Sequence, residues 1–305
     1  MRIRYIKGQI KPKLMISVTT ITSYLYCQRK LFLSCVLGIR EPPKAPMVLG
    51  TVRHDTYEGI TNKEGPIVCS ITEKRSLKDI KELYRKEFSE ILRDSIRKNK
   101  ELLEKLNLDL GAIFKKIWPL ILKESESRAL NIHSFMEMHL VYGRELWEKL
   151  TPKIKSEYRI EAPSLQLKGV IDQIEIYEAG FVPVELKTGK APKEDVWENH
   201  KIQLGAYALL LEEHFKIPVK EGFVNYLDSQ ERRHVPINPF LKDDVKELIK
   251  KTQSILDSEE IPDFTDNPNK CAGCGVRDTC YDKKLLNELL NNGKKNNKTK
   301  DLNIT

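Results

Sequence analysis

The chain has 305 residues, 40% of them hydrophobic and 31% charged, which is enough apolar material for a large core beneath a heavily charged surface. Its 52 Lys and Arg against 44 Asp and Glu give a formal net charge of +8, a balance that favours a polyanionic partner such as nucleic acid. No apolar run approaches the roughly 18 residues of a membrane-spanning helix. The basic start also lacks the apolar stretch of a signal peptide, so we expect a cytoplasmic protein with no membrane contact.

Residues 1–60 are expected to form N-terminal helices. Within 14–35, Tyr24, Cys27 and Leu31 are spaced by three and four, which predicts one helix with all three on the same face. A proline-rich stretch ends this helix. The next short segment has a helical period and carries His54.

Residues 61–154 have a different texture and are interpreted as a helical insertion. Ser76 and Asp79 resemble a capping box that precedes apolar residues at helical spacing. Pro119 is expected to mark a bend, and another helix is expected over about 124–150. No chemical motif is evident here, so a lid or packing layer is the favoured interpretation.

Residues 155–260 are expected to form an α/β core, a mixed sheet flanked by helices. Short strands are predicted up to 187, a helix over 200–215, strands over 221–227 and around 234–237, and a helix over 243–256. Residues 261–285 carry a cysteine cluster. The Asn/Lys-rich tail 286–305 has little to bury, so we expect it to be disordered.

Six cysteines in a chain without a secretion signal favour metal ligation over disulfides. Cys271, Cys274 and Cys280 follow a C-x2-C-x5-C spacing that lets three thiolates converge from one loop. Cys27 would supply a fourth ligand and tether the two ends of the chain. Four thiolates suit either a [4Fe–4S] cluster or a structural zinc ion, and the spacing leaves both open.

Two carboxylates and a lysine fall on adjacent predicted strands. Side chains alternate along a strand, so Glu185 and Lys187 project from the same face, and Asp172 closes the preceding strand. Two carboxylates suit Mg²⁺ or Mn²⁺, which would neutralise a scissile phosphate. Lys187 would orient the attacking water or take its proton.

Three further residues complete this set. His54 suits a site that tolerates Mn²⁺, since imidazole is a softer donor than carboxylate. Gln203 and Tyr207 are four apart and share a helix face, where the amide could hold a phosphate or steady the lysine and the ring could stack on a base. Each residue alone is more often structural, but their joint occurrence indicates a metal-dependent nuclease.

In sequence order, His54, G-V-I-D at 169–172, E-L-K at 185–187 and Q-L-G-A-Y at 203–207 resemble the motifs of RecB-type nucleases in the PD-(D/E)XK superfamily. With Y-x-x-C-x-R-K at 24–30 and the cysteine triplet, the chain resembles the fourth CRISPR-associated (Cas) family, whose members are iron–sulfur DNA exonucleases. The similarity covers about residues 17–60 and 155–281. Gln28 departs from the pattern, because a proline often follows the first cysteine, and the helical block is longer than a minimal member needs.

The resemblance implies a restriction-endonuclease-like fold, single-stranded DNA as substrate, and processing of new CRISPR spacers together with integrase proteins. It implies a [4Fe–4S] cluster on the four cysteines that joins the N- and C-terminal segments. It also implies Mn²⁺ or Mg²⁺, and catalysis by Asp172, Glu185 and Lys187. The implied metal ligands are His54, Asp172, Glu185 and the Leu186 backbone carbonyl.

Two other functions stay open at this point. One is a RecB-like exonuclease of DNA repair or replication, and the other is a non-catalytic DNA-binding iron–sulfur scaffold. The intact set of two carboxylates, histidine and lysine speaks against the scaffold, because binding alone does not need carboxylates facing a phosphate. A homo-oligomer is compatible with each of these functions.

Overall fold

A computed structural model describes residues 5–6, 9–10, 15–188 and 190–300 of the chain. The chain divides into two compact units. The cysteine unit comprises residues 1–42, 161–169 and 238–305, and the sheet unit comprises residues 43–160 and 170–237. Within the described residues, no helix is both long and apolar enough to span a membrane.

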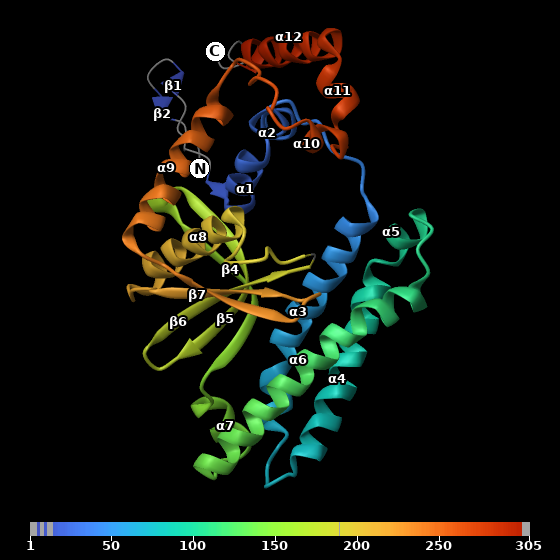
Figure 1. The fold of residues 1–305 in the computed structure, drawn as a ribbon, viewed down its shortest axis with the longest axis vertical. Coiled ribbons are helices and arrows are strands. Elements are labelled where there is room, and N and C mark those ends of the chain that lie inside the picture. The colour runs from blue at the N-terminus through green and yellow to red at the C-terminus, as the bar shows by residue number, and fades with distance from the viewer. Residues whose placement is uncertain (1–4, 7–8, 11–14, 189, 301–305) are drawn as a thin grey trace. The chain divides into compact units, whose positions relative to one another are not determined.

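The sheet unit is built on a mixed sheet, as predicted. Its strands are β4 (Lys153–Ala162), β5 (Leu167–Tyr177), β6 (Gly180–Lys187), β7 (Glu221–Tyr226) and β8 (Glu231–Pro236). β5 pairs antiparallel with β6, β6 parallel with β7, and β7 antiparallel with β8, while β4 pairs with β5. The parallel pair requires a crossover, and helix α8 (Glu198–Phe215) supplies it and packs on β6 and β7 (Figure 1).

Five helices form the rest of the sheet unit, and α4 and α6 run side by side (Figure 1). They are α3 (Ala45–Cys69), α4 (Leu77–Lys98), α5 (Lys100–Lys105), α6 (Leu110–His139) and α7 (Gly143–Lys149). A single apolar core runs through them, and Leu186 of β6 packs against it. The segment interpreted as an insertion therefore shares its core with the helix that carries His54 and the strand that carries Glu185.

Helix boundaries in this segment differ from the expected ones. Ser76 caps α4 as predicted, because its hydroxyl accepts the Asp79 N–H. α6, however, begins at Leu110 and continues through Pro119 to His139. Buried Ile113, Ile117 and Ile121 lie at four-residue spacing on both sides of the proline, and their packing holds the helix together across it.

The cysteine unit is mainly helical. It contains α1 (Val18–Tyr26), α2 (Gln28–Cys35), η1 (Pro163–Leu165), α9 (Pro239–Asp257), α10 (Pro268–Ala272), α11 (Arg277–Tyr281) and α12 (Lys283–Lys300). Strand β3 (Ile16–Ser17) pairs in parallel with the first two residues of β5, and β1 (Tyr5–Ile6) pairs with β2 (Gln9–Ile10). α1 and α2 both pack on α9.

Two expectations for this unit are corrected. The helix predicted over 14–35 is interrupted at Cys27, which is extended (φ −166°, ψ 113°) and caps the start of α2 through its sulfur. The tail expected to be disordered over 286–305 belongs to α12 as far as Lys300, and residues 301–305 lie outside the described residues. Asp282 caps this helix by accepting the Leu285 N–H, and buried Leu286 packs against Leu33.

Candidate active site

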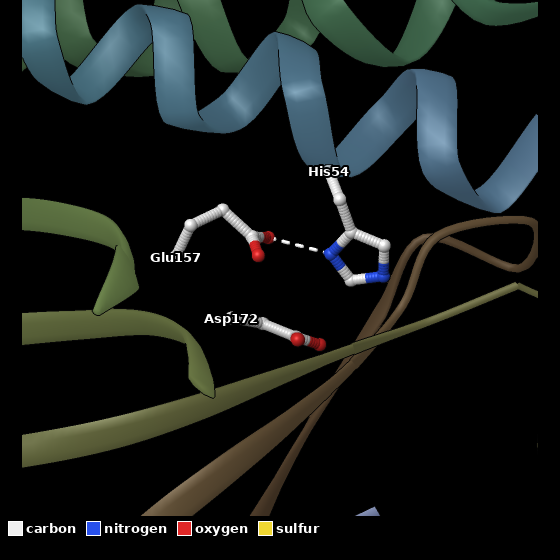
Figure 2. A group of neighbouring side chains, drawn as sticks. All are labelled: His54, Glu157 and Asp172. Atoms are coloured by element: carbon white, nitrogen blue, oxygen red, sulfur yellow. Dashed lines mark hydrogen bonds and ion pairs between the residues drawn. The ribbon is translucent and has the colours of Figure 1, made fainter. Parts of the chain in front are cut away.

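Three side chains from different elements of the sheet unit converge on one point. His54 comes from α3, Glu157 from β4 and Asp172 from β5, and their ligand atoms all lie within 4.8 Å of one another (Figure 2). His54 Nδ1 lies 2.6 Å from Glu157 Oε1. This hydrogen bond raises the pKa of His54 and leaves Nε2 as the nitrogen available to a metal.

Glu185 lies beside Asp172 where the pairing of β5 and β6 ends. The last paired residues are Gln173 and Val184, and Asp172 Oδ2 then accepts the Leu186 N–H at 2.8 Å. Glu185 is 1% exposed. Burial raises the pKa of both acids, and the neighbouring Asp172 charge helps to bring that of Glu185 to about 8.

The donor set fits a hard divalent cation. Within the described residues, the buried Glu185 Oε2 has no hydrogen-bond partner, and an oxygen left in this way is costly. A divalent cation would satisfy that oxygen and offset the charges of two adjacent carboxylates. Carboxylate oxygens with one imidazole suit Mg²⁺ or Mn²⁺. Leu186 lines the same pocket as His54 and Asp172.

Lys187 is held by two side chains at the edge of this site. Its Nζ lies 2.6 Å from Glu185 Oε1 and donates to Gln203 Oε1 at 3.1 Å. Gln203 in turn donates to the Tyr207 hydroxyl at 2.8 Å. Gln203 thus contacts the lysine, one of the two roles expected for it. Tyr207 is 1% exposed, so the expectation that its ring stacks on a base does not agree with the structure.

Two residues near the site were not singled out from the sequence. Glu157 is a lone acid in a strand and has no motif of its own, and its φ of +53° is visible only in the fold. His200 precedes Gln203 by three residues, so helical spacing could have found it. Its Nδ1 lies 3.1 Å from the Tyr226 hydroxyl, and burial with the nearby charge of Lys187 lowers its pKa to about 4.

The four predicted cluster cysteines line one pocket of the cysteine unit, and all of them are free thiols. Arg29 Nε donates to Cys280 Sγ at 3.2 Å, and the Lys30 N–H donates to Cys27 Sγ at 3.4 Å. Burial raises the pKa of Cys280. Four sulfurs around one space, two of them receiving N–H donors, fit a metal group held by thiolates.

Comparisons with known proteins agree with this geometry. A CRISPR-associated exonuclease Cas4/endonuclease Cas1 fusion of Leptospira interrogans is 29% identical over 147 residues, which are 45% of this chain and 27% of that protein. The CRISPR-associated exonuclease Cas4 of Francisella tularensis subsp. novicida is 28% identical over 41% of this chain and 61% of its own length. The DNA replication ATP-dependent helicase/nuclease dna2 of Schizosaccharomyces pombe is 26% identical over 89% of this chain and 18% of its own length.

The chain spans about a quarter of the first of these relatives and less than a fifth of the last. It matches the PD-(D/E)XK nuclease superfamily over residues 15–281, which include both the metal-site residues and all four cluster cysteines. Its relatives thus include both CRISPR-associated Cas4 exonucleases and a DNA replication helicase/nuclease. The chain belongs to the PD-(D/E)XK nuclease superfamily.

Proposed function

We propose that this protein is a metal-dependent DNA exonuclease that prefers single strands. The observation that carries the proposal is the convergence of His54 and Asp172 at ligand distance, with the buried, unpartnered Oε2 of Glu185 beside Asp172. Mn²⁺ or Mg²⁺ would be held by His54, Asp172, Glu185 and the Leu186 carbonyl. The bound cation would offset the cost of burying the Asp172 and Glu185 carboxylates.

The residues around the metal have separate roles in phosphodiester cleavage. When bound, a divalent cation neutralises the scissile phosphate and lowers the pKa of a water molecule. Lys187 has three N–H donors, and Glu185 and Gln203 take two of them. The third can donate to the attacking water or to a phosphate oxygen, so Gln203 acts by aiming the lysine.

The nuclease proposal is tested with end-labelled single-stranded DNA and Mn²⁺. We expect wild-type protein to degrade it from an end, and Lys187→Ala to lose at least about a hundredfold in rate, as loss of an electrostatic catalytic group does. Lys187→Ala should still bind DNA in a gel-shift assay. If the variant cleaved as fast as wild type, the lysine would have no catalytic role. If both proteins bound DNA and neither cleaved it, a binding scaffold would be favoured.

The cysteine unit is proposed to hold a [4Fe–4S] cluster on Cys27, Cys271, Cys274 and Cys280. Support comes from the shared pocket, the two N–H···S contacts and the resemblance to the iron–sulfur Cas family. Iron and sulfide analysis of anaerobically purified protein tests this, with about four irons per chain expected. If the protein were colourless and contained stoichiometric zinc, the four cysteines would be assigned to a structural zinc site and not to a cluster.

The biological role proposed is trimming of DNA during CRISPR spacer acquisition. It rests on relatives whose names join the exonuclease to an endonuclease called Cas1. A role in replication or repair is the second candidate, favoured by the helicase/nuclease that matches 89% of this chain. Pull-down with the integrase of the same organism separates them, since only the first role requires that complex.

A further inference from the structure

We propose that Arg128, on α6, is a positioning residue for the metal site. The proposal rests on the proposed function, because it concerns Asp172, a proposed metal ligand, and Glu157, which is hydrogen-bonded to the proposed ligand His54. In the described part of the chain, the hydrogen bonds and ion pairs of Arg128 go to residues other than these two acids. Arg128 instead fixes the chain next to each one.

Arg128 is the centre of a buried polar network and is itself 1% exposed. Its Nε donates to Glu124 Oε1 at 2.7 Å, and one terminal nitrogen donates to the Glu64 carboxylate. The other terminal nitrogen donates to Ser156 Oγ at 3.2 Å, and a weaker contact reaches the Ile154 carbonyl. A guanidinium can satisfy this many directions at once because its donors form a rigid fork.

The network reaches both strands that carry the acids. Ser156 immediately precedes Glu157 on β4, and Gln173 immediately follows Asp172 on β5. Gln173 Nε2 donates to Glu124 Oε1 at 3.0 Å, the same oxygen that Arg128 holds. One guanidinium–carboxylate pair therefore ties both strands to α6 one residue away from each acid.

The backbone at Glu157 needs this support. Its φ of +53° is a left-handed conformation that non-glycine residues rarely adopt, and it persists only where the surroundings impose it. Ser156 is anchored twice, by Arg128 at its hydroxyl and by Thr61 Oγ1, which accepts its N–H at 2.6 Å. These anchors hold the strand backbone from which Glu157 reaches His54 Nδ1.

The charges indicate positioning more than stability. The guanidinium and the Glu64 carboxylate are buried and the Glu124 carboxylate is half-buried, so the desolvation cost of the group largely offsets its Coulomb attraction. An apolar set of similar volume would serve packing as well. The group of Arg128 and its carboxylate partners instead fixes the geometry of β4 and β5, on which the positions of Glu157 and Asp172 depend.

Arg128→Lys tests this proposal, because lysine keeps the charge but cannot fork to Glu64, Glu124 and Ser156 together. We expect Mn²⁺ affinity, measured calorimetrically on folded protein, to fall about tenfold or more, the usual loss when a group supporting metal ligands is removed. Excess Mn²⁺ should restore cleavage. Ser156→Ala removes one hydroxyl and little stability, so it covers the case in which Arg128→Lys fails to fold, and it should also weaken Mn²⁺ binding.

Ile121→Ala is the matched control, since Ile121 is fully buried on the same helix and packs only in the apolar core. It should lower Tm while leaving Mn²⁺ affinity within about twofold of wild type. If Arg128→Lys and Ser156→Ala bind Mn²⁺ like wild type, or if the control weakens binding equally, the proposal is overturned. Wild-type protein that bound no Mn²⁺ would instead refute the proposed function itself.

Discussion

Metal binding by this protein should be coupled to proton release from Glu185. The side chain is 1% exposed and lies beside Asp172, and these surroundings raise its pKa to about 8 in the metal-free protein. At pH 7 only about 9% of the molecules would have this carboxylate ionised, against about 50% at pH 8 and about 91% at pH 9. Mn²⁺ requires the ionised form, so apparent affinity should rise about fivefold from pH 7 to 8 and about tenfold from pH 7 to 9.

The same shift sets how the stability of the metal-free fold depends on pH. A carboxyl with a raised pKa stabilises the fold below its unfolded value, and this contribution disappears as pH rises through the folded value. The window is therefore pH 4.5 to about 8. The difference between the unfolded and folded pKa of Glu185 corresponds to a loss on the order of 5 kcal/mol in the free energy of unfolding across that window. Mn²⁺ should raise Tm most at the alkaline end.

Calorimetry in two buffers of different ionisation enthalpy measures the released protons directly. We expect about 0.9 proton from Glu185 at pH 7, falling towards zero above pH 9. His54, whose pKa is raised by its hydrogen bond to Glu157, adds to the release at the acid end. Glu185→Gln provides the control, since it has no proton to lose.

Wild-type affinity that stayed flat between pH 7 and 9, with no proton released at pH 7, would falsify the coupling. Glu185 would then be ionised in the metal-free protein. Burial beside Asp172 would have to be compensated in another way. The argument that a metal is needed to compensate these two buried carboxylates would then fail.

Three other changes have distinct expected results. Trp197 is 49% exposed at the start of α8. Trp197→Ala should therefore raise the KM for single-stranded DNA about tenfold through lost stacking, with kcat retained. Phe240→Ala, which removes an 80% exposed ring from the other unit, should not raise the KM. Gln203→Leu frees Lys187, so kcat should fall about tenfold in a single-turnover assay while DNA binding is unchanged, and equal losses in both would contradict the aiming role. Arg29→Met removes the N–H···S contact and two carbonyl contacts, so iron content per chain and Tm should both drop, and full iron retention would show that this arginine does not support the cluster.

Much of the site follows from local periodicity, which the sequence displays directly. Glu185 and Lys187 share a strand face because the period is two, and Gln203 and Tyr207 share a helix face because they are four apart. The spacing of the cysteine triplet likewise predicts one short segment, although Cys271 and Cys280 lie in α10 and α11 and not in a single loop. Each of these relations connects residues a few positions apart, so one sequence suffices to predict it.

The features that could not be predicted depend on distant contacts or on single backbone angles. Cys27 sits in a helical pattern, yet an extended conformation there divides the helix in two. Arg128 contacts residues 64 positions before it and 28 after it, and an arginine in a charged helix carries no local sign of burial. Glu157 acquires its role through a left-handed φ that no propensity indicates.

The buried acids and the Arg128 network address one physical problem. In the metal-free protein, Asp172 and Glu185 are placed together before any cation is present, and their mutual repulsion favours moving apart. Strand pairing alone does not prevent this, since the ladder between β5 and β6 ends one residue before the two acids. The tie from α6 to Gln173 acts at that point on β5 and opposes movement of Asp172. A weakened tie should therefore lower metal affinity most at high pH, where both acids are ionised, and this dependence distinguishes held geometry from general loss of stability.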